Sequence, residues 1–195
     1  MNDYLTQSDE VLQNKLGISD PIKLKKVEGE VGFARQMQLE SEPLPLHYDF
    51  DLLKRIHFVL FSDIYDFAGK VRCVDITKGP VPFCYVQNID TEQKRIFCNL
   101  KIENYLKGLH RESFVERLVY YAAELNALHP FREGNGRTIR VFLGLLAQNA
   151  GLFIRYHMCT KEDLLYADIQ AFSGDLYPLT ELYYRIIQSS TATIQ

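Results

Sequence analysis

Several features that define common protein classes are scarce or missing in this sequence. No run of about 18 apolar residues occurs, so no membrane-spanning helix is expected. The N-terminal stretch MNDYLTQSDE is polar and acidic and lacks the apolar core of a signal peptide. We therefore expect a cytoplasmic protein that does not associate with a membrane.

Cysteine and positive charge are also limited. The four cysteines form no CxxC pair and fit no zinc pattern, which predicts free, buried or half-buried thiols in a reducing compartment: Cys73, Cys84, Cys98 and Cys159. Lys and Arg number 22 against 25 Asp and Glu, and the net charge is −3. Without a basic excess, direct binding of nucleic acid is disfavoured. Any phosphate binding must be local.

The residues that are present predict a globular, all-α protein. At 195 residues and 47% hydrophobic, the chain can bury a core. Apolar periodicity and capping patterns predict seven or eight helices, at 20–40, 49–67, 91–107, from Ser113 to His129, at 139–150, from Thr160, and at 176–188. A β-hairpin is predicted from strands at 71–76 and 82–87. No linker divides the chain, so we expect one domain over 1–195, with a core at 49–172 and an N-terminal arm and helix at 1–40.

The chemistry of the chain is concentrated in His129-Pro-Phe-Arg-Glu-Gly-Asn-Gly-Arg137-Thr-Ile-Arg140. Gly134, Asn135 and Gly136 at a helix start can direct backbone N–H groups at an anion. Arg137 and Arg140, three apart on one helical face, suit phosphate oxygens. Glu133 can hold Mg²⁺, and His129 can accept a proton near neutral pH. The pattern predicts a nucleoside-phosphate site.

This motif resembles the signature of the Fic family, His-x-Phe-x-(Asp/Glu)-Gly-Asn-Gly-Arg-x-x-Arg, at every fixed position. The segment Asp66-Phe-Ala-Gly-Lys70-Val-Arg72 resembles the family's aromatic-Ala-Gly-Lys-x-Arg sequence. Residues 11–18 resemble the start of short, stand-alone Fic toxins. The resemblance covers roughly residues 10–185 and implies the Fic fold.

The resemblance implies transfer of AMP from ATP to a Ser, Thr or Tyr hydroxyl of another protein. In that mechanism His129 is the general base, and Glu133 positions Mg²⁺. Gly134, Asn135 and Gly136 form the anion cradle, while Arg137 and Arg140 bind the β- and γ-phosphates.

A target-aligning hairpin, called the flap in this family, is implied by Ile76-Thr-Lys-Gly79 and the following Phe83. The family's usual Phe-Arg-Phe run is Val81-Pro82-Phe83 here, so the edge of this flap differs. Lys78, Gly79 and Phe83 are the residues expected to contact the target or the nucleotide.

Control by a partner is also implied. Many Fic proteins carry an inhibitory helix, (Ser/Thr)-x-x-x-Glu-(Gly/Asn), whose glutamate pairs with the second motif arginine. Thr6–Glu10 is followed by Val11, and Leu24–Glu28 starts without the hydroxyl residue, so neither segment matches fully. We therefore expect a small antitoxin to supply the glutamate, with internal autoinhibition and a housekeeping role as the alternative. Toxins of this kind often modify subunits of DNA gyrase or topoisomerase IV.

Alternative functions stay open. The Doc branch transfers phosphoryl groups, but it replaces the second glycine of the motif with lysine, whereas Gly136 is intact here. Other nucleotide or phosphocholine donors are compatible with the motif. A catalytically silent binding module ranks last because the histidine and both arginines are present. The remaining histidines show no ligand spacing and are interpreted as core or surface residues: His47, His57, His110 and His157.

Overall fold

The structure, a computed structural model, describes residues 11–78 and 81–189. These residues form seven α-helices: α1 Pro21–Ser41, α2 Phe50–Phe61, α3 Val86–Ile102, α4 Arg111–Leu128, α5 Asn135–Asn149, α6 Lys161–Phe172 and α7 Tyr177–Ile186. Two short 3₁₀ helices lie at Asn104–Leu106 and Tyr156–Met158. A single cluster of buried apolar side chains draws on every α-helix. The predicted all-α fold is confirmed for the described residues.

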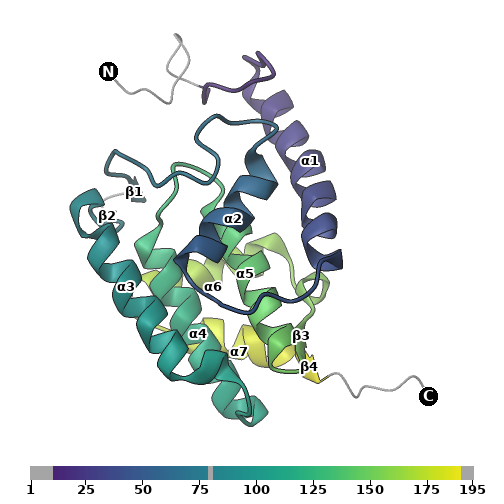
Figure 1. Cartoon of the computed structure of the whole chain (residues 1–195), viewed down its shortest axis with the longest axis vertical. Helices are drawn as coiled ribbons and strands as arrows, with labels where there is room; N and C mark the ends of the chain where they lie inside the picture. The colour runs from purple at the N-terminus through teal and green to yellow at the C-terminus, as the bar shows by residue number, and fades with distance from the viewer. Residues whose placement is uncertain (1–10, 79–80, 190–195) are drawn as a thin grey trace.

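Helix α5 lies at the centre of the fold and packs against α2, α4 and β3, Leu152–Ile154 (Figure 1). Its side chains between Ile139 and Ala147 are mostly buried, as expected of a helix that is apolar nearly all round. The helix begins at Asn135, so the second half of the motif forms its first turn. The Gly134–Gly136 sequence predicted to bind an anion thus leads directly into this buried helix.

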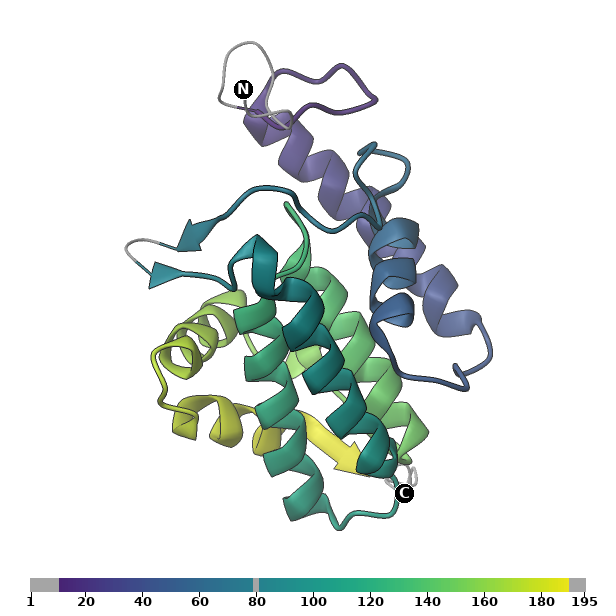
Figure 2. The ribbon, with the colours of Figure 1, turned by 60° about the vertical axis from the view of Figure 1, so that its left-hand side comes forward.

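Helix α1 begins and ends where its sequence predicts. Asp20 accepts hydrogen bonds from the backbone N–H groups of Ile22 and Lys23, and Pro21 occupies the first turn. The helix then lies along α2, on the side of the molecule away from α6 and α7 (Figures 1 and 2). The capping pattern predicted at Thr160 is also confirmed, because its side chain and that of Asp163 cap each other's backbone at the start of α6.

Several predicted boundaries are wrong. The hairpin consists of β1 Thr77–Lys78 and β2 Val81–Pro82, instead of strands at 71–76 and 82–87. A second antiparallel pair, β3 with β4 Ile187–Ser189, was not predicted. Helix α2 ends at Phe61 instead of residue 67, and α3 spans 86–102 instead of 91–107. Ser113 lies inside the first turn of α4, whose N-cap is His110.

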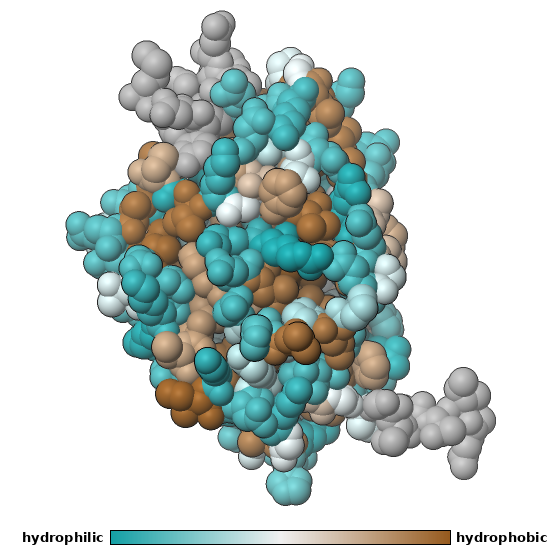
Figure 3. Space-filling model, in the orientation of Figure 1, coloured by the Kyte–Doolittle hydropathy of each residue, from teal (hydrophilic) through white to brown (hydrophobic). Residues whose placement is uncertain are grey.

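The molecular surface mixes hydrophilic and hydrophobic residues on the face shown in Figure 3. In the part of the chain that the structure describes, no helix is both long and apolar enough to cross a bilayer. All four cysteines are free thiols. The expectation of burial is wrong for Cys73 and Cys98, which are exposed, while Cys84 and Cys159 are half-buried.

Candidate active site

The motif occupies the turn between α4 and α5. His129 ends α4 in the left-handed conformation, with φ 43° and ψ 59°. A right-handed helical conformation is disfavoured there because Pro130 follows. The His129 N–H still bonds to the Leu125 carbonyl at 3.1 Å, so the residue is fixed to the end of the helix. The chain then turns through residues 130–134 and enters α5.

The Asn135 side chain holds this turn closed. Its Oδ1 accepts the Phe131 N–H at 2.9 Å, and its Nδ2 donates to the Phe131 carbonyl at 2.7 Å. The residue is only 2% exposed. The side chain therefore shapes the loop, which leaves the backbone N–H of Asn135 as the group that this residue can offer to an anion.

Glycine is required at position 134 for two reasons. Its φ is +79°, a conformation that side chains with a Cβ rarely adopt. A Cβ here would also lie 2.4 Å from two carbons of the Phe61 ring. The Gly134 carbonyl accepts both the N–H and the hydroxyl of Thr138, each at 3.0 Å. Because the Phe61 ring of α2 leaves no room for a Cβ, the loop backbone at Gly134 packs directly against α2.

A histidine that the sequence did not assign to the site supports the same loop. The His57 ring is fully buried and stacks on Phe131, with centroids 3.9 Å apart. Its Nδ1 accepts the Gly69 N–H at 2.8 Å, so Nε2 carries the proton and donates to the Glu133 carbonyl at 2.9 Å. Burial lowers the pKa of His57 to about 4, which keeps the ring neutral.

His129 is arranged as a proton acceptor. Its Nδ1 lies 3.2 Å from the Asn126 carbonyl, which can only accept a hydrogen bond. In the neutral ring Nδ1 therefore bears the hydrogen, and Nε2 is the nitrogen that can accept a proton. Phe83 stacks on one face of the ring at 3.7 Å and is only 8% exposed. In this position Phe83 supports the ring, and little of its side chain is available to a docking target.

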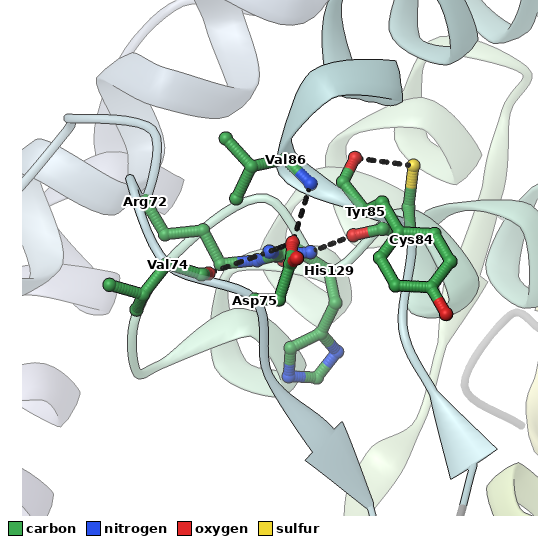
Figure 4. A network of polar contacts seen from close by, with 7 residues as sticks. All are labelled: Arg72, Val74, Asp75, Cys84, Tyr85, Val86 and His129. Atoms are coloured by element: carbon green, nitrogen blue, oxygen red, sulfur yellow. Dashed lines mark hydrogen bonds and ion pairs between the residues drawn. The ribbon is translucent and has the colours of Figure 1, made fainter.

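A buried arginine joins the histidine to the hairpin (Figure 4). The Arg72 guanidinium donates to the carbonyls of His129 at 2.8 Å, Val74 at 2.9 Å and Cys84. Asp75 lies 3.7 Å from its Nη1 and accepts the N–H of Val86 at the start of α3. The segment around Arg72, which resembles a family sequence, thus fixes the start of the motif through the His129 carbonyl. The sequence alone did not indicate this structural function.

The first turn of α5 presents the candidate anion-binding groups. The Gly134 N–H bonds to Glu133 Oε1 at 2.9 Å. The N–H groups of Asn135, Gly136 and Arg137 have no acceptor among the described residues, as expected for the first turn of a helix. These amides and the positive end of the helix dipole can bind a phosphate.

The two motif arginines extend from this turn toward different neighbours. Arg137 is directed toward α1 and α2, where its guanidinium lies 5.1 Å from the centre of the Phe61 ring. Arg140 lines a recess with Asn126, Asp168 and other residues of α4, α6 and α7. The two side chains therefore contact different neighbours, α1 and α2 for Arg137 and α4, α6 and α7 for Arg140.

The position of Glu133 is compatible with its predicted role as a ligand of Mg²⁺. The side chain is exposed beside the open amides, and one oxygen holds the Gly134 N–H. No group of three or more His, Cys, Asp or Glu side chains in residues 11–78 and 81–189 could hold a metal. A single carboxylate completed by substrate phosphates is a usual arrangement for Mg²⁺. The donor set therefore fits a cation that arrives with the nucleotide.

The flap residues are only partly described. Lys78 pairs with Val81 across the hairpin, and Thr77 pairs with Pro82. Gly79 lies outside the described residues. The hairpin extends from the body of the molecule on the side of α3 (Figure 2).

The first-turn amides of α5, which have no acceptor in the part of the chain that the structure describes, lie at the same turn as His129. Such an arrangement in a helical protein is compatible with chemistry on phosphate esters. Comparison with known proteins gives the family. The profile of the Fic/DOC family matches residues 47–147. The chain belongs to this family.

The curated relatives are named as adenylyltransferases. Protein adenylyltransferase VbhT of Bartonella schoenbuchensis is 37% identical over 96% of this chain, which spans 39% of that protein. The protein named "Probable protein adenylyltransferase Fic" of Escherichia coli is 34% identical, with 96% of this chain and 92% of the relative covered. The family context is thus that of nucleotidyltransferase enzymes.

Solved structures agree with this assignment. An N-terminal Fic domain from Bartonella quintana with bound ADP has a TM-score of 0.91 at 30% identity, covering 97% of this chain and 96% of that chain. BepC from Bartonella tribocorum with bound AMPPNP has a TM-score of 0.90 at 30% identity, covering 96% and 97%. Proteins of this fold and of similar sequence therefore bind adenine nucleotides.

Proposed function

We propose that this chain is a protein adenylyltransferase that transfers AMP from ATP to a Ser, Thr or Tyr hydroxyl of a target protein. The observation that carries the proposal is the contact of His129 Nδ1 with the Asn126 carbonyl, which makes Nε2 the proton-accepting nitrogen at the turn that leads into α5. His129 takes the hydroxyl proton, and the oxygen attacks the α-phosphorus. The bond from that phosphorus to the bridging oxygen breaks, and pyrophosphate leaves.

The remaining motif residues bind the phosphates in this proposal. The amides of Gly134, Asn135 and Gly136 receive phosphate oxygens, and Arg137 and Arg140 offset the charge of the β- and γ-phosphates from two sides. When bound through Glu133, Mg²⁺ supplies further positive charge to the phosphates. ATP is thus a co-substrate, and it lies with its α-phosphate toward His129.

Phosphoryl transfer is the second candidate, and Gly136 argues against it. The resemblance to Doc-type enzymes would call for a lysine at this position. A Cβ at Gly136 would lie 3.3 Å from Nη1 of Arg140, so a larger side chain would press on that guanidinium. The glycine leaves Arg140 free to approach the nucleotide in the AMP-transferring orientation.

For regulation, we infer that the chain is a cytoplasmic toxin restrained by a small antitoxin that supplies an inhibitory glutamate to Arg140. The internal candidate Thr6–Glu10 lies outside the described residues. The other candidate, Glu28, faces Arg137: its carbonyl accepts the Arg137 Nη1 hydrogen at 2.9 Å. This placement favours a glutamate supplied from outside. The flap is the proposed docking edge for the target, for which a gyrase or topoisomerase IV subunit is the family expectation.

The test is a transfer assay in cell lysate with ATP labelled on the α- or the γ-phosphate. Wild type and His129→Ala are compared, each with and without any small protein encoded next to this one. The proposal requires a protein band that takes up α-label only when His129 is present, and less of it when an antitoxin is added. Uptake of γ-label without α-label would instead identify a kinase.

A further inference from the structure

Helix α1 contacts the phosphate site through Arg137. The Arg137 Nη1 donates to the carbonyl of Glu28 at 2.9 Å, a residue 109 positions earlier in the chain. On its other side the guanidinium lies over the Phe61 ring of α2. The cation is thus held between α1 and α2.

A glycine on α1 makes room for this guanidinium. A Cβ at Gly32 would lie 2.8 Å from Arg137 Nη1, 3.5 Å from its Cδ and 3.7 Å from its Cζ. Gly32 lies in the interior of α1 and has no positive φ, so the backbone does not require glycine there. Alanine is the better helix former at such a position. The space needed by Arg137 explains why glycine stands there.

The Glu28 side chain adds a buried charge to the same place. Glu28 is 9% exposed, and its Oε1 has no hydrogen-bond partner among the described residues. Arg137 attracts the ionised form and lowers the pKa of Glu28, but burial, the larger effect, raises it. Glu28 and the space left by Gly32 are four residues apart and so lie on the same face of α1.

We propose that α1 is a positioning element of the phosphate site, in which Gly32 and the Glu28 carbonyl fix the Arg137 guanidinium before ATP binds. The inference rests on the proposed function only in that Arg137 binds phosphate. A guanidinium that is already oriented loses less rotational freedom on binding and needs no reorganisation during the reaction. Glu28 is then a supporting residue of the site and no inhibitor.

The test compares two alanine substitutions on the same helix. Gly32→Ala places a methyl group against Arg137, whereas a Cβ at Gly29 has nothing within 4 Å. Both changes raise helix propensity, so thermal unfolding should show two folded proteins. The inference predicts that Gly32→Ala weakens binding of a non-hydrolysable ATP analogue on the order of tenfold, because the charge is displaced. Gly29→Ala should bind as wild type does. Equal affinities of both variants would overturn the inference.

A double-mutant cycle shows whether Gly32 acts through Arg137. In an Arg137→Ala background, Gly32→Ala should have no further effect on nucleotide affinity. An undiminished effect in that background would contradict the inference. Because affinity is measured without turnover, this result is separate from a failure of AMP transfer in the wild type.

Glu28→Gln provides a second, independent variant. It keeps the backbone carbonyl and the side-chain volume, and it should lower kcat/KM for ATP without raising transfer. A gain in transfer would mean that Glu28 is an internal inhibitor and would reject its supporting function.

Discussion

Mild acid should weaken the fold through one buried side chain, His57. The ring is neutral because Nδ1 accepts the Gly69 N–H while Nε2–H donates to the Glu133 carbonyl. Protonation would place a hydrogen on Nδ1, and two donors would then face each other in a site without solvent. The motif loop would lose one of its fixed points.

The magnitude follows from the pKa of His57. Burial lowers it from 6.5 to about 4, so between these values the unfolded chain binds more protons than the folded one. Stability therefore falls as the pH drops below about 6.5. Between about pH 7.5 and about pH 5, this one group should cost about 2 kcal/mol of unfolding free energy.

The assay is urea unfolding at a series of pH values for wild type and His57→Gln. The variant starts less stable because it loses the stack on Phe131, but it lacks the titrating group. The difference between the two unfolding free energies should shrink by about 2 kcal/mol toward about pH 5. His110→Gln, which removes an exposed histidine at the start of α4, is the matched control. If the unfolding free energies of wild type and His57→Gln changed in parallel with pH, the claim that His57 is neutral and accepts a hydrogen bond at Nδ1 would be refuted.

Two substitutions test other supports of the motif. Gly134→Ala should destabilise the chain by about 2 kcal/mol more than Gly151→Ala. Both substitutions strain a backbone with positive φ, but only the methyl group at position 134 also overpacks against a neighbouring ring. Both glycines have nearly the same positive φ, but only a Cβ at Gly134 meets Phe61, so equal melting temperatures would contradict this. Arg72→Lys should lower kcat at least tenfold with little change in ATP affinity, because lysine cannot span the carbonyls of His129, Val74 and Cys84 and so cannot tie the His129 backbone to the hairpin. A change confined to ATP affinity would argue against that role.

Local signals in the sequence predicted local structure well. The Asp20-Pro21 start of α1 and the Thr160 capping box are complete within a few residues, so both are confirmed. The strands at 71–76 and 82–87 were misplaced because contacts outside the hairpin hold these residues: Arg72 bonds to the His129 carbonyl, and the Cys84 N–H bonds to the Ala127 carbonyl of α4. The Phe83 N–H still bonds to the Ile76 carbonyl beside the short hairpin. Strands β3 and β4 pair across a long separation that periodicity does not show.

The candidate site divides in the same way. The motif from His129 to Arg140 is continuous in sequence, so its residues could be named as the candidate site from the sequence alone. Its supports come from far away: Arg72 is 57 positions from His129, and His57 is 76 from Glu133. The signal for His57 was its place on the apolar face of α2, between Leu53 and Leu60, where a polar ring needs buried partners. Only the folded chain identifies those partners.

The central claim is that His129 drives transfer of AMP to a protein hydroxyl. The most direct measurement is peptide mass spectrometry of the protein that becomes labelled when the chain is supplied with ATP and Mg²⁺. The account predicts a Ser, Thr or Tyr residue carrying one AMP, absent when His129→Ala replaces the wild type. A residue carrying phosphate alone, or AMP transfer that survives His129→Ala, would contradict the account.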